Sequence, residues 1–272
     1  MKRFMTPDEI TGAVVEMGVK KAGLKIEQSI LLSIFAGVFV GFGAHASLTV
    51  MQTLKGIDAG IMKFMGGAVF PVGLMLVILA GGELFTSNNL LTVAVLDRKL
   101  TIKKTLKNWI IVYFGNFAGS IILAVVLYYS GLYGSGDMLT PAGVLAKDVA
   151  AHKVELTFME AFFRGIMCNI LVVLAVWIVT GAQDVVSKIF ACWFPVMLFV
   201  LSGFEHSIAN MYYLTLGYLL NPLMDLTRAV FSNLIPATLG NIVGGALIVP
   251  FVYYFALHKP KNLKLVEKKE AA

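Results

Sequence analysis

Two ionisable side chains lie in the middle of an apolar run that is long enough to cross a lipid bilayer. The run extends from Lys188 to Asn221, and Gly203, Glu205 and His206 interrupt it. About 20 apolar residues span the hydrocarbon core of a bilayer. An ionisable group at that depth costs roughly 2.5–3.5 kcal/mol, so it usually faces a bundle interior or an aqueous cavity. The pattern predicts a broken helix that lines a permeation route, and the alternative is a His–Glu pair that only ties helices together.

The composition also indicates a membrane protein. Of the 272 residues, 58% are hydrophobic and 14% are charged, whereas soluble domains carry about 25% charged residues. The formal net charge of +6 could suit a nucleic acid, but the placement of the basic residues described below argues against such a partner. Residues 1–27 lack the apolar core of a cleavable signal. We therefore expect the first membrane span to act as its own insertion signal.

Six apolar segments predict six membrane-spanning helices. They cover residues 28–50, 62–96, 109–130, 155–180, 188–221 and 234–257. The second segment has roughly 35 residues, well above the length of one span, so it must break or re-enter the membrane. Gly82–Thr86 is the polar interruption available there. Helices 2 and 5 of the predicted bundle are therefore both broken.

The segments outside the spans complete the predicted domain organisation. Residues 1–27 have apolar positions at helical spacing, which is typical of an amphipathic helix at a membrane surface. Residues 97–107 form a basic loop, 131–153 and 221–233 form polar loops, and 258–272 form a basic tail. With six spans, 16 Lys and Arg residues flank one side of the membrane and five flank the other. Because basic flanking residues stay in the cytoplasm, we expect a plasma-membrane protein with both termini cytoplasmic, and the bias also accounts for the net charge.

The two halves of the chain, about 28–131 and 155–257, share four short motifs in the same order. The pairs are Phe70-Pro71-Val72 with Phe194-Pro195-Val196, Gly81-x-Glu83 with Gly203-x-Glu205, Gly115-Asn116 with Gly240-Asn241, and Tyr128-Tyr129 with Tyr253-Tyr254. Three spans per half is an odd number, so the second half enters the membrane from the opposite side. The sequence thus predicts an all-α membrane protein with six transmembrane helices in a 3+3 inverted repeat. In such folds the broken helices meet at a substrate site between the halves, where helix N-termini attract an anion.

Polar side chains near the breaks are the candidates for that site. His206 can change charge near neutral pH because an unperturbed imidazole titrates around 6.5, so it suits the exchange of a proton with a weak-acid anion. Lys153, just before the fourth span, is interpreted either as a charge that draws anions into a vestibule or as a snorkelling interfacial residue. Thr86 and Asn169 offer hydrogen bonds without charge, although the backbone of their own helices could also satisfy them.

Two further groups of residues flank the breaks. Large apolar side chains could form constrictions that gate by dewetting, or could simply pack: Phe70, Leu74, Leu84 and Phe199. A second group would hold the unwound geometry of the breaks: Gly82, Glu83, Gly203 and Glu205.

The sequence contains no spacing typical of a metal site, a P-loop or a serine nucleophile. We therefore predict no catalytic residues, no metal and no cofactor. Cys168 and Cys192 lie in apolar runs and are interpreted as packed thiols.

The motifs around both breaks resemble those of the formate/nitrite transporter family. The stretches that carry the resemblance are Ala80–Ser87, Ser202–Met211, Tyr113–Asn116 and Asn233–Pro236, and the likeness extends from about residue 6 to residue 257. Formate-type members of the family often have Asp at the position of Glu83. The resemblance implies an aquaporin-like six-helix subunit that assembles as a homopentamer with one pore per subunit.

The resemblance also implies roles for individual residues. His206 would be the central pore histidine with Asn169 beside it, and Lys153 would be the vestibule lysine. The other implied positions are Leu84 and Thr86 in the first break, Phe70, Leu74 and Phe199 at the narrow points, and Asn241 as the polar residue of helix six.

From these features we predict passage of a small monovalent anion, formate above all, with a proton at His206 coupling or gating the movement. Nitrite and hydrosulfide are alternative substrates. A channel for neutral solutes such as water or ammonia shares the architecture, and predicts flux that ignores Lys153→Glu, whereas anion recruitment predicts a loss. A membrane-embedded enzyme that uses Glu205 and His206 as acid and base is the alternative from another class.

Overall fold

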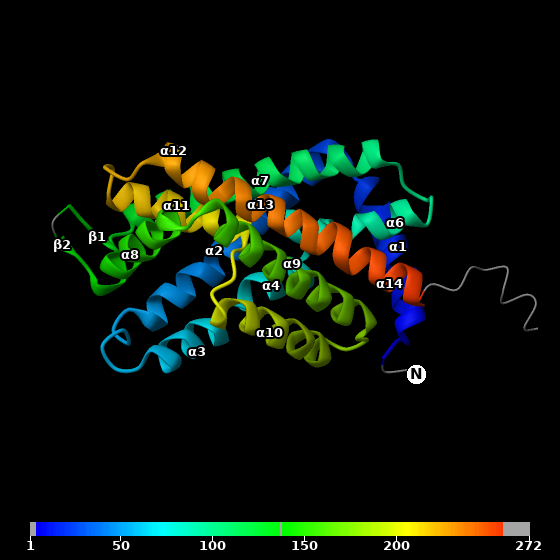
Figure 1. Ribbon diagram of the computed structural model, residues 1–272, viewed down its shortest axis with the longest axis horizontal. Helices are drawn as coiled ribbons and strands as arrows, with labels where there is room; N and C mark the ends of the chain where they lie inside the picture. The colour runs from blue at the N-terminus through cyan, green and yellow to red at the C-terminus, as the bar shows by residue number, and fades with distance from the viewer. Residues whose placement is uncertain (1–3, 137, 258–272) are drawn as a thin grey trace, which may run out of the picture.

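The computed structural model describes residues 4–136 and 138–257, so the predicted basic tail at 258–272 lies outside the described residues. Figure 1 shows an elongated bundle of helices. In chain order the elements are α1 (Pro7–Ala22), α2 (Ile26–Met51), α3 (Ala59–Val69), α4 (Val72–Leu76), the π-helical η1 (Val77–Gly81), α5 (Phe85–Asn88), α6 (Leu91–Leu96), α7 (Ile102–Tyr129), the two-residue strands β1 (Gly134–Ser135) and β2 (Met138–Leu139), α8 (Pro141–Glu155), α9 (Phe158–Gly181), α10 (Val185–Leu201), α11 (Ser207–Leu220), α12 (Leu226–Arg228), the π-helical η2 (Ala229–Leu234), α13 (Ile235–Ile242), the π-helical η3 (Val243–Ile248) and α14 (Val249–Leu257).

Within the described residues, five helical stretches are long and apolar enough to cross a membrane. They are Ile26–Met51, Ala59–Gly81, Ile102–Tyr129, Phe158–Gly181 and Leu226–Leu257. The second predicted run ends its first helix at Gly81 and resumes as the short apolar helix Phe85–Leu96. The fifth, predicted over 188–221, consists of Val185–Leu201 and Ser207–Leu220. The chain is therefore an all-helical membrane protein with five to six apolar helices, apart from the small antiparallel pair β1–β2.

Helix α1 is fixed at its start by side chains of its own first turn. Thr6 and Glu9 form a capping box, and Pro7 is the first helical residue, a position where its missing N–H is not needed. Val14 and Val15 are fully buried on the side of α1 that packs against α6 and α9. In Figure 1, α1 lies at the same end of the bundle as α6 and the end of α14, and α8 with the β1–β2 hairpin lies at the other end.

Two helices begin earlier than the charge pattern predicted. Thr101 caps α7, which starts at Ile102 instead of residue 109, so most of the predicted basic loop is helical. Asp225 accepts a hydrogen bond from the backbone N–H of Arg228, and the last helix starts at Leu226 instead of residue 234. Part of each predicted loop is therefore helical, because lysine and arginine side chains extend along a helix to reach polar surroundings, so their charges do not mark where the helix begins.

Small residues bring the main helix pairs into close contact. Helix α2 packs along α7, and α13 packs along α9. A Cβ atom placed on Gly119 of α7 would collide with the carbonyl oxygen of Ile34 on α2, whereas one on Gly12 of α1 would meet no atom within 4 Å. Glycine at 119 thus sets the distance between α2 and α7, the close approach that small residues allow in membrane bundles.

Replacing Gly119 by leucine is therefore expected to lower stability by several kcal/mol, because overpacking forces the helices apart and costs typically 1–3 kcal/mol even in milder cases. Thermal unfolding in detergent measures the effect. Gly12→Ala is the matched control, and it should leave stability unchanged or raise it by up to about 1 kcal/mol, since alanine is the better helix former. Equal behaviour of the two variants would contradict close packing at Gly119.

Candidate functional site

Two apolar runs break at short non-helical segments that contain a left-handed glycine. Gly81 has φ of +95° and α5 resumes at Phe85. Gly203 has φ of +71° and α11 begins at Ser207. Glycine populates this region without steric cost. The predicted residue Gly82 has an extended backbone with φ of −156°, so the left-handed residue of the first break is Gly81.

An asparagine from α7 holds the first break in place. The side-chain oxygen of Asn116 accepts a hydrogen bond of 2.9 Å from the backbone N–H of Phe85. Its amide nitrogen donates to the carbonyl oxygens of Glu83 at 2.9 Å and Ser33 at 2.7 Å. A helix interruption leaves backbone groups without helical partners, and this amide satisfies two of them.

Asn241 on α13 does the same for the second break. Its side-chain oxygen accepts from the N–H of Ser207 at 2.9 Å, and its nitrogen donates to the carbonyl oxygens of Glu205 at 2.9 Å and Gly165 at 2.8 Å. The side chain of this predicted pore residue therefore bonds to the backbone of the break and of α9. The two asparagines stand in the repeated Gly-Asn motif of the sequence.

Glu205 is the centre of a buried polar cluster. Lys153 on α8 donates to both carboxylate oxygens, at 3.0 and 2.9 Å. Asn210 and Asn233 donate to the same carboxylate at 2.6 and 3.0 Å. Lys153 was predicted either as a vestibule charge or as a snorkelling residue, and the structure places its ammonium group in an ion pair with Glu205. Its charge is therefore compensated.

A second cluster of the same composition surrounds Glu83. Lys21 on α1 donates to Glu83 at 2.7 Å and to Asn88 at 3.0 Å, and Asn88 donates to Glu83 at 2.7 Å and to Asn108 at 2.9 Å. Lys21 was not among the predicted site residues. The equal spacing of Asn108 and Asn233 from the two Gly-Asn motifs was a usable signal for the asparagines, but the two lysines occupy unrelated places in the chain.

His206 joins the two breaks. The imidazole is 3% exposed, and its Nε2 lies 2.9 Å from Oγ1 of Thr86 in the first break. Its Nδ1 accepts a hydrogen bond of 3.1 Å from the backbone N–H of Ala209, so the side chain caps α11. Because Nδ1 acts as an acceptor, the proton of the neutral ring resides on Nε2, which donates to Thr86. The ring of Phe199 stacks on the imidazole at a centroid distance of 5.7 Å.

Asn169 lies beside this pair with one unused acceptor. Its nitrogen donates to the carbonyl oxygens of Thr86 at 3.3 Å and Asn241 at 2.7 Å, and to the side chain of Asn89 at 2.8 Å. Its oxygen is buried without a hydrogen-bond partner among the described residues. This amide therefore ties α9 to the first break and to α13, the helix that holds the second break.

The predicted constriction residues surround a very small cavity next to His206. The cavity has a volume of about 10 Å³ and is lined by Val40, Phe70, Leu74, Leu84, Val172, Val196, Phe199 and His206. That is about the space that one water molecule needs. Phe70 and Phe199 contact each other edge to face at 5.5 Å, so the two aromatic rings pack together at the wall of this cavity.

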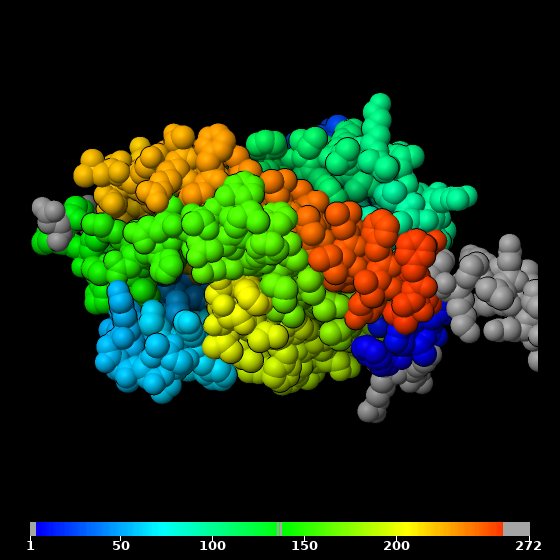
Figure 2. All heavy atoms as spheres, in the orientation of Figure 1, coloured from blue at the N-terminus to red at the C-terminus, as the bar shows by residue number. Residues whose placement is uncertain are grey.

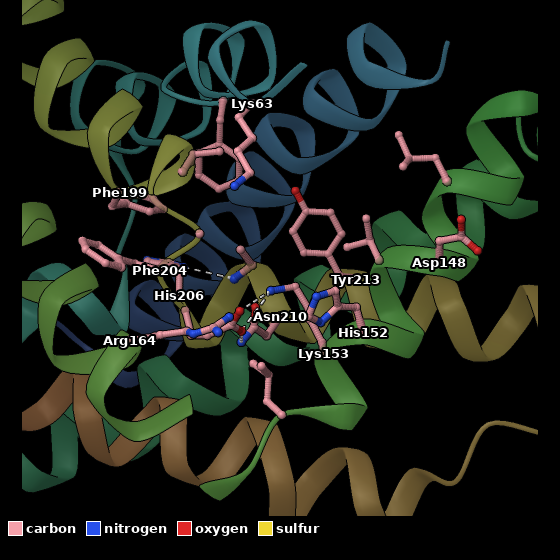
Figure 3. Close-up of a pocket in the computed structure, with 18 of the residues that line it drawn as sticks. Lys63, Asp148, His152, Lys153, Arg164, Phe199, Phe204, His206, Asn210 and Tyr213 are labelled. Carbon is pink, nitrogen blue, oxygen red and sulfur yellow. Dashed lines mark hydrogen bonds and ion pairs between the residues drawn. The ribbon is translucent and has the colours of Figure 1, made fainter. Parts of the chain in front are cut away.

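Two wider pockets are lined in part by residues of the two breaks. We call the first the α8-side vestibule; it has a volume of about 410 Å³, and its lining includes Phe70, Phe199, His206, Lys153 and Glu205. Figure 3 shows His206 and Phe199 on one side of it and Lys153 on the other, and Figure 2 shows the surface hollowed between α3 and α8.

The second pocket, the α1-side pocket, has about 330 Å³ and is lined in part by Lys21, Gly82 and Glu83. Each polar break thus lines one charged pocket, and the α8-side vestibule shares Phe70, Phe199 and His206 with the small cavity. In the part of the chain that the structure describes, no three His, Cys, Asp or Glu side chains are grouped as a metal site.

Comparison with known proteins identifies the family. A family model described as formate/nitrite transporter matches residues 8–255. The chain is 37% identical over 259 residues to "Uncharacterized transporter YrhG" of Bacillus subtilis, covering 94% of this chain and 95% of the relative. It is 36% identical over 265 residues to "Formate channel BtFdhC" of Bacillus thuringiensis, covering 96% and 99%. A solved structure titled "Pentameric formate channel with formate bound" superposes with a TM-score of 0.75 at 34% identity, covering 85% of this chain and 97% of that one. The chain, with its two clamped helix breaks and the histidine between them, belongs to the formate/nitrite transporter family.

Proposed function

We propose that the protein moves a small monovalent anion, formate in the first place, across the plasma membrane through a pore within each subunit. The observation that carries this proposal is the His206–Thr86 hydrogen bond beside a cavity of about 10 Å³, with a charged pocket on either side. A pore this narrow suits ions of a few atoms that shed their water. The relatives named as formate channels and the formate-bound structure favour formate, with nitrite or hydrosulfide as the alternative substrate.

We also propose the inverted 3+3, aquaporin-like repeat as the architecture of the pore. Matching hydrogen bonds of Asn116 and Asn241 support it, as do the two Lys–Glu–Asn–Asn clusters. Tyr113 and Thr238, which are separated by 125 residues, bond to each other at 3.1 Å. The repeated Gly-Asn motif has the same offset, so Tyr113 and Thr238 occupy equivalent positions in the two halves. Equivalent residues contact each other where they lie close to the two-fold axis that relates the halves. A homopentamer is proposed from the formate-bound relative.

The proposal also includes the orientation of the chain in the membrane. The bias of 16 basic residues against five supports cytoplasmic termini, and the start of the chain and the end of α14 lie at one end of the bundle in Figure 1. The α1-side pocket would then open to the cytoplasm and the α8-side vestibule to the outside.

Within this pore His206 would act as a hydrogen-bond donor to the anion. In the neutral imidazole, the Nε2 proton forms a hydrogen bond with Thr86 and could form one with the anion instead, but it stays on the ring. Delivery of a proton to the anion requires the imidazolium, and a second proton at Nδ1 would face the N–H of Ala209, which now donates to that atom. Proton coupling would therefore involve loss of the α11 cap, a change worth about 1 kcal/mol in helices generally.

Flux into liposomes that contain the purified protein tests the proposed function. Formate, nitrite and hydrosulfide are compared at several pH values, and formate is expected to enter faster than into protein-free liposomes. If nitrite or hydrosulfide entered and formate did not, that anion would replace formate as the proposed substrate. Passage of ammonia or water alone would reject an anion pathway, and substrate turnover by detergent-solubilised protein would favour the enzyme hypothesis.

A further inference from the structure

The α8-side vestibule carries more positive charge than its ion pairs compensate. Its lining includes Lys55, Lys63, Lys153 and Arg164 together with the two carboxylates of Asp148 and Glu205. With His152 neutral, the charged lining sums to +2. Two of the cations are matched one to one: Lys153 pairs with Glu205 at 2.9 Å, and Lys55 pairs with Asp148 at 2.9 Å.

Lys63 and Arg164 account for the surplus. Within residues 4–136 and 138–257, neither side chain forms an ion pair within 4.0 Å. Glu160, one turn before Arg164 on α9, interacts electrostatically with it, but its carboxylate is hydrogen-bonded to Thr157 at 2.8 Å and does not line the vestibule. Lys63 is exposed and Arg164 is half-buried, so both charges are available to the liquid in the vestibule.

Both cations stand on helix faces that lead to the constriction. Lys63 precedes Phe70 by two helical turns, which places it roughly 10 Å further out on the same face. Arg164 begins a stripe of α9 that continues through Cys168 to Val172, a residue that lines the small cavity. Figure 3 shows Lys63 and Arg164 coming from opposite walls of the vestibule.

We propose that Lys63 and Arg164 form an anion-recruitment pair at the mouth of the α8-side vestibule. The proposal rests on the function proposed above and names the residues that concentrate the anion before it reaches the constriction. Charges that line a cleft raise the local concentration of an oppositely charged solute. In water, one charge at about 10 Å changes the occupancy of a monovalent anion about two-fold. The pair therefore acts on the half-saturation concentration of anions that enter from this side.

Lys153 contributes less to anion recruitment than Lys63 and Arg164 because its charge is compensated by Glu205. Its ammonium group is bonded to both oxygens of a buried carboxylate, so the field of the pair falls off quickly with distance. Lys153→Glu would set a second carboxylate against Glu205 and disturb the break itself. Arg164 contacts the second break only through its backbone carbonyl, which accepts from the N–H of Glu205 and is retained in a glutamine variant. Neither charged side chain forms an ion pair with the clusters that hold the breaks.

The test uses Lys63→Gln, Arg164→Gln and the double variant. Lys103→Gln is the control, since it removes an exposed charge from the first turn of α7, which does not line the vestibule. Formate influx is measured in right-side-out membrane vesicles with the full-length protein, as a function of external formate. In about 0.01 M salt, where screening extends over about 30 Å, each single variant is expected to raise the half-saturation concentration about two-fold and the double variant about four-fold. Maximal flux stays unchanged, because the constriction is intact.

Salt separates recruitment from a structural effect. In about 1 M salt, where screening acts within about 3 Å, the double variant and the wild type should converge. Thermal unfolding in detergent checks that the variants are folded. An unchanged half-saturation concentration at low salt in a transporting protein would overturn the recruitment pair, as would a shift equal to that of Lys103→Gln. Absence of anion flux in the wild type would instead overturn the proposed function.

Discussion

Replacing Glu205 by leucine is expected to destabilise the protein by about 3–5 kcal/mol, the usual effect of removing one partner from a buried ion pair. Glu205 is 4% exposed, and the side chain of Lys153 is 14% exposed. The substitution leaves the ammonium group without its carboxylate. It also leaves the amide groups of Asn210 and Asn233 without a common acceptor. Unfolding in detergent measures the loss.

Two further variants separate the parts of that effect. Glu205→Gln keeps an acceptor for the asparagines but removes the charge, so it should be milder than Glu205→Leu. The double variant Lys153→Met/Glu205→Leu removes both charges and should be more stable than Glu205→Leu alone. Replacing both members of a buried ion pair leaves no unpaired charge, whereas removing one member does. If the double variant were no more stable than Glu205→Leu, the unpaired ammonium group would not be the source of the loss.

Replacing His206 by phenylalanine is expected to remove any pH-dependent part of formate flux and to lower stability by about 1 kcal/mol, because phenylalanine cannot cap α11. His206→Asn separates the two roles. An asparagine side chain can accept from the N–H of Ala209 as the imidazole does, so stability should stay within a few tenths of a kcal/mol of the wild type. Its shorter side chain cannot reproduce the contact with Thr86, so the pH-dependent part of flux should be lost.

Liposome flux over a pH range and thermal unfolding, measured on the same preparations, check this prediction. Thr86→Val serves as the companion variant, since it keeps the imidazole and the cap but removes the hydroxyl that Nε2 contacts. Unaltered pH dependence in His206→Asn at near-wild-type stability would rule out a proton role for the imidazole. A large stability loss in His206→Asn would instead show that the cap needs the ring itself.

The helix breaks could be predicted from the sequence because the bilayer imposes them. A run of roughly 35 apolar residues does not fit one span, and the polar stretches at Gly82–Thr86 and Gly203–His206 were the places where it could open. The short repeated motifs further indicated that the two breaks meet. The structure accordingly brings Thr86 and His206 to 2.9 Å across 120 residues of sequence.

The partners of the charged residues could not be predicted in the same way. The ion pair of Lys153 with Glu205 depends on how α8 packs beside the second break. Likewise, Lys21 contacts Glu83 only because α1 packs against the first break. Neither contact has a fixed spacing along the chain. The surplus charge of Lys63 and Arg164 becomes visible only once these pairs have been assigned.

The way the two asparagines bind the breaks has a consequence for how the pathway can open. Each amide of Asn116 and Asn241 holds backbone groups of a break and of a neighbouring helix at once. The main chain around the histidine is thereby fastened at its narrowest level, while the rings of Phe70 and Phe199 are held by packing alone. Under the proposed function, rotation of these two side chains alone would open the way, so a subunit whose helices were cross-linked in place should still conduct.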